Sequence, residues 1–154
     1  MSKIIAIDYG LKRIGIAISD ESQILAFGLN TISNLEIISF LRETIKKENV
    51  NILVIGKPLK KDNTPSEIEN IILGFIKKLK IIFPQIIIER YDERFTSIIA
   101  KKTIIESGIN KKKRADKKLV DKISATLILQ SFLEKKKYEI TNSCIWKPSF
   151  KIKM

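Results

Sequence analysis

The sequence predicts the α/β fold class, and three observations support this prediction. Three short apolar strands follow one another between residues 4 and 31 with short connections, which is typical of an antiparallel meander. A wholly apolar stretch at residues 52–55, preceded by an amphipathic helix, has the pattern of a buried parallel strand. The 154 residues, 44% of them hydrophobic, suit one compact domain. The chain should therefore join an antiparallel meander to parallel strands through crossover helices.

The first strand, residues 4–7, is apolar on both faces and ends in Asp8. Apolar side chains on both faces indicate a central strand. A carboxylate at the rim of a buried strand costs free energy unless hydrogen bonds or a cation compensate its charge. Asp8 is therefore either a turn residue that accepts backbone N–H bonds or a catalytic acid, and this segment alone favours neither.

The second and third strands share a face of small residues. The second, residues 14–19, alternates isoleucine with glycine, alanine and serine, so one face is bulky and the other is nearly bare. The third, residues 24–31, continues the bare face with Ala26 and Gly28. We expect another element to pack closely against this surface.

Two helix–strand units complete the predicted sheet. Residues 33–36 (Ser-Asn-Leu-Glu) form a capping-box pattern, which predicts a helix with Leu35 among its apolar positions. Residues 64–67 (Thr-Pro-Ser-Glu) open a second helix in the same way. The strands at 52–55 and 86–90 follow these helices, and right-handed crossovers are expected.

Polar residues follow both of these later strands. The loop at residues 56–63 leaves the first of them, and Asp92, Glu93 and Arg94 leave the second. Open α/β sheets place their ligands at the carboxyl ends of parallel strands. The acid pair is therefore either a solvated turn or part of a site at the same sheet edge as Asp8.

The last predicted helix, residues 117–135, carries an acid on a packing face. Asp121 begins a face that continues with Ser124 and Ala125 and is otherwise small or apolar. These small residues would let the helix lie close against the bare strand surface and bring Asp121 towards Asp8. The alternative is that Asp121 only favours the positive end of the helix dipole.

Composition excludes several kinds of site. Histidine is absent, which removes histidine triads, histidine general bases and histidine-containing zinc sites and leaves carboxylate chemistry. Cys144 is the only cysteine, so no internal disulfide forms and a reducing compartment fits. Asp8 comes too early for a signal-peptide core, and no apolar run approaches membrane-spanning length. We expect a cytoplasmic protein with no membrane partner.

Positive charge points to a polyanionic partner. Lysine and arginine total 29 against 17 acidic residues, a formal charge of +12, which favours nucleic acid over a small neutral ligand. Residues 110–118 form a basic run that is either a solvated loop or a phosphate-binding segment. Residues 138–154 form a basic tail in which Trp146 and Phe150 either stack on bases or dock back on the domain.

Several motifs in a fixed order resemble one protein family. They are residues 7–10 (IDYG) with 13–15 (RIG), 56–58 (GKP), 92–96 (DERFT), 120–125 (VDKISA) and 129–132 (LQSF). In this order they resemble the YqgF (RuvX) family, a bacterial branch of the RuvC-like, ribonuclease-H-like nucleases. The match covers about residues 3–135, and the ordered set is far more specific than any single motif.

The resemblance implies a ribonuclease-H-like nuclease domain over residues 1–137. Its fold would be a mixed five-stranded sheet flanked by helices, with the first three strands antiparallel and the last two parallel. Its activity would be the hydrolysis of phosphodiester bonds, in maturing the 5′ end of the 16S ribosomal RNA precursor. The family's acidic positions map onto Asp8, Glu93 and Asp121, with Asp92 as a further candidate metal ligand.

The acids and the resemblance together imply a divalent metal. Two carboxylates about 4 Å apart repel by roughly 4 kcal/mol at an effective dielectric of about 20, so three converging acids need a cation. Hard oxygen ligands select Mg²⁺ or Mn²⁺, which would activate water and stabilise the leaving oxygen of a phosphodiester. Asp8 would bridge the metals, and Glu93 and Asp121 would complete their shells. The basic residues that would hold phosphates are Arg13, Arg94, Lys111, Lys112, Lys113, Arg114, Lys117 and Lys118.

Other functions are compatible with the same residues. The substrate is structured RNA or branched DNA, so a Holliday-junction resolvase is one alternative. A non-catalytic RNA-binding assembly factor of the same fold is another, and metal-dependent cleavage would separate it from a nuclease. An ATPase of the actin and sugar-kinase type needs two related lobes, for which 154 residues leave no room. Both a monomer and a homodimer fit the sequence.

Overall fold

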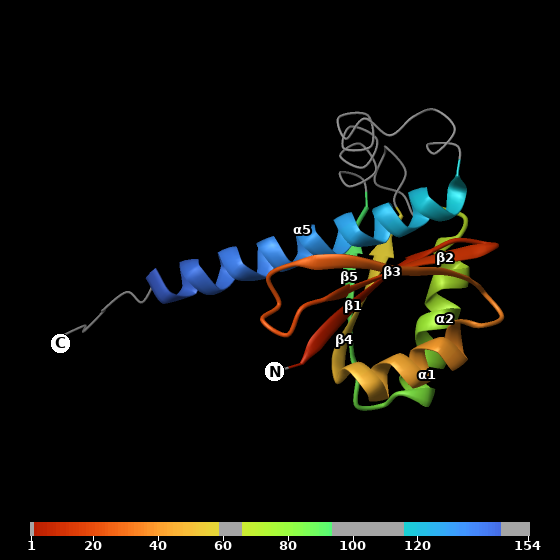
Figure 1. Cartoon of the computed structure of the whole chain (residues 1–154), viewed down its shortest axis with the longest axis horizontal. Coiled ribbons are helices and arrows are strands. Elements are labelled where there is room, and N and C mark those ends of the chain that lie inside the picture. The colour runs from red at the N-terminus through yellow and green to blue at the C-terminus, as the bar shows by residue number, and fades with distance from the viewer. Residues whose placement is uncertain (1, 59–65, 94–115, 146–154) are drawn as a thin grey trace, which may run out of the picture.

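The computed structural model describes residues 2–58, 66–93 and 116–145, with side chains through Thr141, and in this part of the chain the strands form one five-stranded sheet (Figure 1). The strands are β1 (Lys3–Tyr9), β2 (Arg13–Ser19), β3 (Ala26–Ser33), β4 (Val50–Lys57) and β5 (Ile87–Asp92). The helices are α1 (Ile37–Glu48), α2 (Glu69–Ile82) and α5 (Lys117–Ile145). The order across the sheet is β3-β2-β1-β4-β5, so β1 is the central strand.

The strand pairing confirms the predicted fold class. β1 pairs antiparallel with β2, and β2 pairs antiparallel with β3. β4 lies parallel to β1 on its other side, and β5 lies parallel to β4. The meander and the crossover strands therefore share one mixed sheet, and the carboxyl ends of β1, β4 and β5 point to the same edge.

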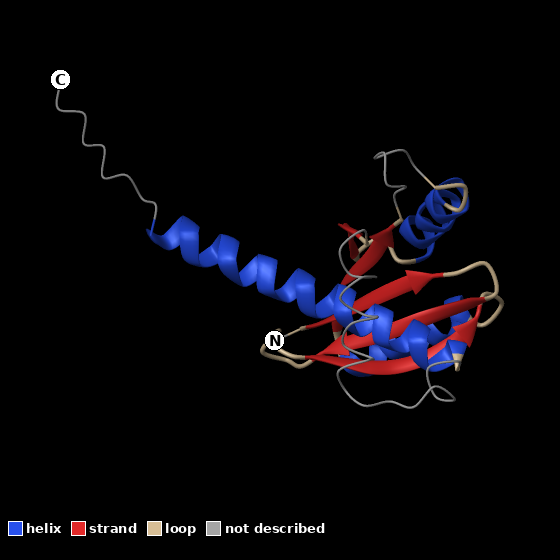
Figure 2. Ribbon diagram, turned by 90° about the horizontal axis from the view of Figure 1, so that it is seen from above, coloured by secondary structure: helices blue, strands red, loops and turns tan. Residues whose placement is uncertain are grey.

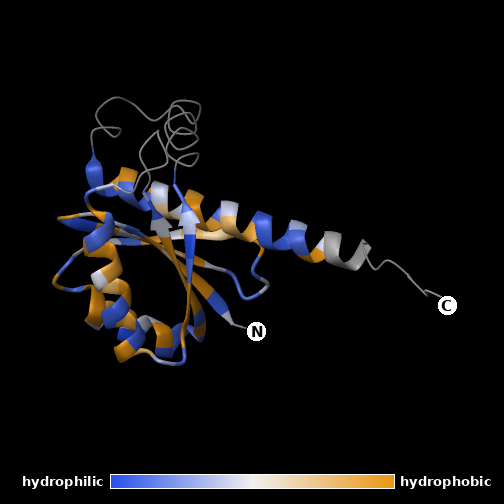
Figure 3. Cartoon of the chain, turned by 180° about the vertical axis from the view of Figure 1, so that it is seen from behind, coloured by the Kyte–Doolittle hydropathy of each residue, from blue (hydrophilic) through white to orange (hydrophobic). Residues whose placement is uncertain are grey.

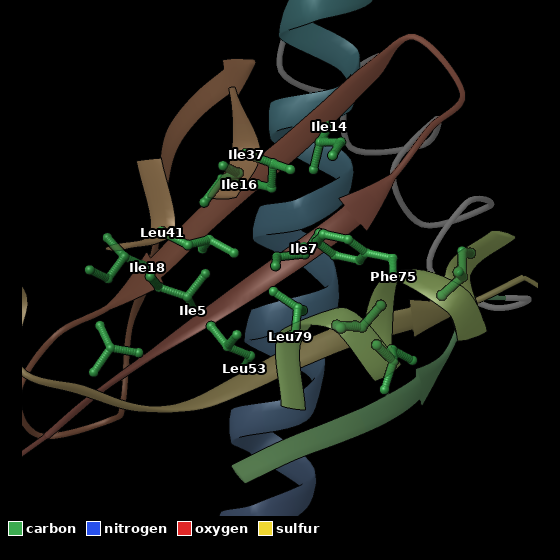
Figure 4. Packing of buried hydrophobic residues seen from close by; sticks show 14 residues of the cluster. Ile5, Ile7, Ile14, Ile16, Ile18, Ile37, Leu41, Leu53, Phe75 and Leu79 are labelled. Carbon is green, nitrogen blue, oxygen red and sulfur yellow. The ribbon is translucent and has the colours of Figure 1, made fainter. Parts of the chain in front are cut away.

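Helices cover both faces of the sheet, and each face has its own apolar core. α1 and α2 lie on one face, whereas α5 runs across the strands on the other (Figures 1 and 2). Because side chains alternate along a strand, β1 contributes Ile5 and Ile7 to the first core and Ile4 and Ala6 to the second. Figure 4 shows the first core, in which β1 and β2 residues meet Leu41 of α1 and others from α2.

The helix starts differ from the sequence prediction. Residues 33–36 do not form a capping box: the Glu36 N–H donates to the Ser33 carbonyl at 3.1 Å, so the chain makes a turn before α1 begins at Ile37. Leu35 is consequently 95% exposed and packs on nothing, although the pattern placed it on the apolar face. α2 begins at Glu69, and Ile68 at its cap position makes no side-chain cap bond. The expected cap residues 64 and 65 lie outside the described residues.

The last helix is longer than predicted. α5 continues to Ile145, past the expected end at residue 135, and projects beyond the sheet (Figure 1). Hydrophilic residues dominate the first part of this projection (Figure 3), where Tyr138 and Ile140 are exposed apolar exceptions. Apolar residues recur along a helix where one face packs on a sheet. The apolar periodicity therefore ends near residue 135, before the helix itself ends. No described helix is both long and apolar enough to span a membrane.

Candidate functional site

Asp8 lies between two glycines at the carboxyl edge of the sheet. In the β1–β2 ladder Asp8 pairs directly with Gly15. On the other side Ile7 pairs with Ile55 of β4, so Gly56 is the residue next to Asp8. Neither neighbouring strand therefore places a side chain beside the carboxylate on the α5 face of the sheet. The two glycines leave room there for groups from other elements.

Gly15 brings the backbone of α5 against the sheet. A Cβ atom at this position would overlap the backbone carbonyl oxygen of Asp121 and would lie 3.3 Å from its Cα. Ala125, one turn further along α5, is fully buried against the same strands. The small-residue face of the first three strands therefore does what the sequence predicted, and it places Asp121 over β2 next to Asp8.

Gly56 makes room for Glu93. A Cβ atom on Gly56 would overlap the Glu93 carboxylate and would lie 2.8 Å from its Cγ. The Glu93 N–H donates to the Lys57 carbonyl at 3.2 Å, which holds the chain beside β4 just after β5 ends. The Glu93 side chain folds back across β4 and forms a side-chain hydrogen bond with Asp8.

Asp8 and Glu93 form a buried acid pair that keeps a proton at neutral pH. Burial raises the pKa of Glu93 to about 9, with further contributions from the negative charge of Asp8 and from the hydrogen bond between the two. Burial and the charge of Asp121 raise the pKa of Asp8 to about 6, while the hydrogen bond from Glu93 lowers it. At pH 7 the pair therefore holds about one proton, which the two carboxyl groups share through their hydrogen bond.

Asp121 is compensated by a different group. The Nε of Arg13, the first residue of β2, donates to Oδ2 of Asp121 at 2.9 Å. Both side chains are partly exposed. Arg13 was expected to hold a phosphate; in this structure its guanidinium neutralises the candidate acid on α5.

The candidate acids thus meet as a pair with a third acid beside them. Among the described residues no three acids are close enough to form a complete metal site as they stand. Asp121 acts on Asp8 through its charge, but its carboxylate pairs with Arg13. Asp92 ends β5 in register with Lys57 of β4. The donors are all carboxylate oxygens, the set that suits a hard divalent cation, and the shared proton and Arg13 now supply the positive charge that such a cation would bring.

A second ion pair, which the sequence interpretation missed, supports the same edge from the α2 face, and its acid is buried. Arg90 of β5 donates from Nη1 to Oε1 of Glu69 at 2.7 Å and from Nη2 to Oε2 at 3.0 Å. It also donates to the Ile55 and Gly56 carbonyls at 3.2 and 3.0 Å. Glu69 is only 5% exposed and lies on the apolar face of α2. The sequence prediction selected Asp121 because it is an acid on an apolar helix face. The same criterion would have selected Glu69.

Apart from Arg13, the basic residues of the sequence prediction fall into two groups. Lys117 and Lys118 begin α5 and are exposed. The others lie outside the described residues: Arg94, Lys111, Lys112, Lys113 and Arg114.

Comparison with known proteins finds one family and one fold. Residues 2–135 match the family model described as RuvX, Holliday junction resolvase. A protein of Flavobacterium psychrophilum named "Putative pre-16S rRNA nuclease" is 52% identical over 136 residues, which are 88% of this chain and 99% of that protein. A protein of Bacteroides thetaiotaomicron with the same name is 47% identical over 138 residues, 90% of this chain and 100% of its own.

Two solved structures share the fold at low sequence identity. RuvC of T. thermophilus in complex with a Holliday junction substrate has a TM-score of 0.56 at 12% identity, covering 89% of this chain and 97% of RuvC. The yeast mitochondrial Holliday junction resolvase Ydc2 has a TM-score of 0.58 at 12% identity, covering 94% of this chain and 83% of Ydc2. These likenesses confirm the ribonuclease-H-like architecture.

Proposed function

The chain belongs to the RuvX family, and from that premise we propose that it is a metal-dependent nuclease that hydrolyses phosphodiester bonds of the 16S ribosomal RNA precursor. Relatives that align over almost their whole length carry the name of that activity. The net charge of +12 suits a nucleic-acid substrate.

The observation that carries this proposal is the buried Asp8–Glu93 pair with Asp121 beside it. In a protein that only binds RNA, buried acids would not favour binding, because they repel phosphate and cost free energy to desolvate. A metal-dependent hydrolase requires them as cation ligands. The raised pKa values of Asp8 and Glu93 support this reading, since strongly shifted groups that meet at one edge of a sheet are typical of functional sites.

The chain's own residues then have distinct roles. Asp8, Glu93 and Asp121 would hold the ion, with Asp92 as a further candidate ligand at the end of β5. A bound Mg²⁺ or Mn²⁺ supplies an activated water and stabilises the leaving oxygen. As a ligand Glu93 would be ionised, because a ligating carboxylate is deprotonated. Arg13 then lies at the rim of the site, where its guanidinium suits a substrate phosphate.

A DNA resolvase is the second candidate function. The family model is described as a Holliday junction resolvase, and both structural neighbours are resolvases. The same carboxylate chemistry cuts either backbone, so the choice between RNA and branched DNA rests on the surfaces that surround the site.

One experiment separates these functions and tests the site. Purified protein is incubated with precursor 16S RNA and with a four-way DNA junction, each with Mn²⁺, Mg²⁺ or chelator. We expect metal-dependent cleavage of the RNA. The Asp8→Asn variant should fold, because it keeps the shape of the side chain, and should lose cleavage. Junction cleavage alone would favour the resolvase, whereas cleavage by a folded Asp8→Asn protein would refute the metal site.

A further inference from the structure

A groove lies between the edge strand β3 and the first two turns of α5. It has a volume of about 280 Å³ and is lined by Asn30, Thr31, Asp116, Lys118, Leu119 and Lys122. This volume is at the low end for ligand sites, so it suits a single nucleotide unit better than a larger ligand. The lining is polar and carries two lysines against one acid.

The Lys122 side chain crosses β3 at Gly28, where no side chain stands in its way, and reaches the groove. A Cβ atom on Gly28 would lie 2.7 Å from Cγ of Lys122 and 3.1 Å from its Cδ, so the lysine stem crosses β3 where the side chain is missing. The stem packs on the strand while the lysine lines the groove. Within the described part of the chain, no carboxylate forms an ion pair with Lys122.

Lys118 lies one turn before Lys122 on the same side of α5. Like charges four residues apart on a helix repel by a few tenths of a kcal/mol. Among the residues that the structure describes, no acid forms an ion pair with either lysine. The Thr31 hydroxyl donates to the Lys118 carbonyl at 2.7 Å and ties the strand to the helix below them. Asp116 accepts from the Lys118 N–H at 3.1 Å, so its carboxylate is engaged with the helix backbone. The groove is thus lined by two lysines and by one acid whose carboxylate accepts a hydrogen bond from the helix backbone.

The groove also adjoins the carboxylate site. Lys122 directly follows Asp121, and successive helix residues point about 100° apart. Asp121 meets Arg13 of β2, whereas Lys122 meets Gly28 of β3, the next strand towards the edge. A nucleic-acid strand that leaves the carboxylates in this direction passes over β3 and meets the groove.

We propose that this groove binds the sugar-phosphate backbone of the substrate strand, with Lys118 and Lys122 on one of its phosphates. The proposal rests on the proposed nuclease function, and it adds where the strand lies next to the site. Because both lysines contact only phosphate, the groove should act on every nucleotide sequence alike.

The test compares two double variants that remove the same charge. Lys118→Gln with Lys122→Gln alters the groove, and Lys46→Gln with Lys47→Gln alters two exposed lysines of α1 on the opposite face of the sheet. Binding of single-stranded RNA to the full chain is measured with chelator present, over a series of salt concentrations. Loss of the contact to that one phosphate should flatten the slope of log affinity against log salt by about 0.7 units, and the α1 pair should leave it unchanged. Equal slopes for the two variants would contradict the proposal that the groove binds a backbone phosphate.

Gly28→Ala tests the position of Lys122 without changing the charge. The three atoms nearest to the added methyl group belong to the side chains of Lys122 and Thr126, so we expect the lysine stem to be displaced while the backbone stays in place. We expect weaker RNA binding with a normal melting temperature. Unchanged affinity would contradict the path of Lys122 across β3.

These outcomes are separable from those of the nuclease proposal. If the wild-type protein cleaves RNA but the groove variant keeps its salt slope, phosphate binding by the groove is refuted and the nuclease proposal is supported. If the salt slope falls but no metal supports cleavage, phosphate binding by the groove is supported and the nuclease proposal is refuted.

Discussion

At the scale of single residues, the site consists of acids that need compensation. Asp8 and Glu93 share a proton, and Asp121 has Arg13. Asp8 and Asp121 could be predicted from the sequence as candidate site residues, because each is an acid at the end of an apolar or small-residue pattern. Glu93 could be assigned only through the family resemblance, because the sequence Asp-Glu-Arg after a strand is as typical of a solvated turn as of a functional site. Which side chain Arg13 meets depends on the packing of α5, and no local pattern contains that information.

The shared proton predicts an unusual pH dependence of stability in the metal-free protein. The pKa values of Asp8 and Glu93 are raised in the folded state, so between about pH 5 and pH 8 the folded chain holds protons that the unfolded chain has lost. The free energy of unfolding should therefore fall as pH rises through this window, by up to about 1.4 kcal/mol per pH unit for each retained proton. Denaturant unfolding with chelator, from pH 5 to 8, measures it.

Glu93→Gln is the control for this effect. Glutamine keeps the hydrogen bond to Asp8 but cannot titrate, so the variant should lose most of the fall in stability and should be more stable than the wild type at pH 8. A variant whose stability falls as steeply as that of the wild type would show that Glu93 is not the titrating group.

At the scale of elements, two glycines set the distances at which α5 and the segment after β5 approach the sheet. The sequence predicted close packing on the bare face, because Gly15 belongs to an alternating pattern of small residues. It did not predict the role of Gly56, which was assigned to a loop but belongs to β4. The start of α1 was misplaced because a capping-box sequence can equally form a simple turn, and only the packing of Ile37 and Leu41 decides between them.

Alanine at the two glycines should have different effects. At Gly15 the new methyl group meets the backbone of α5, which cannot move without losing its core contacts, so we expect a loss of about 1–3 kcal/mol or more in stability. At Gly56 the three atoms nearest to the methyl group belong to the Glu93 side chain, so the fold should be retained while the bond to Asp8 is broken. Thermal unfolding of both variants measures the difference.

Gly74→Ala is the matched control for these two variants. Gly74 is exposed in the middle of α2, and nothing lies within 4 Å of a Cβ atom placed there. Alanine should stabilise the helix by about 1 kcal/mol. If Gly15→Ala were as well tolerated as Gly74→Ala, α5 would not be in contact with β2 as described.

At the scale of the whole molecule, α5 connects the features that bear on function. It carries Asp121 towards the acid pair, lines the groove with Lys118 and Lys122, and then projects past the sheet. The α/β class, the antiparallel meander and the parallel crossover strands could be predicted, because apolar periodicity and short connections determine them. The length of α5 could not, because beyond residue 135 the described part of the helix adds no residue to the apolar cores and so bears no apolar pattern. The domain boundary at residue 137 stays a prediction, and residues 146–154 of the basic tail lie outside the described part of the chain.

The central claim is that Asp8, Glu93 and Asp121 form a divalent metal site. Calorimetric titration of the wild-type protein with Mn²⁺ near pH 7.5, in two buffers of different ionisation enthalpy, tests it most directly. We predict saturable Mn²⁺ binding with release of about one proton, the one that Glu93 holds when its pKa is raised to about 9. Asp8→Asn should abolish the binding, and Glu93→Gln should weaken it and remove the proton release. Absence of Mn²⁺ binding by the wild type, or equal binding by a folded Asp8→Asn protein, would contradict the claim.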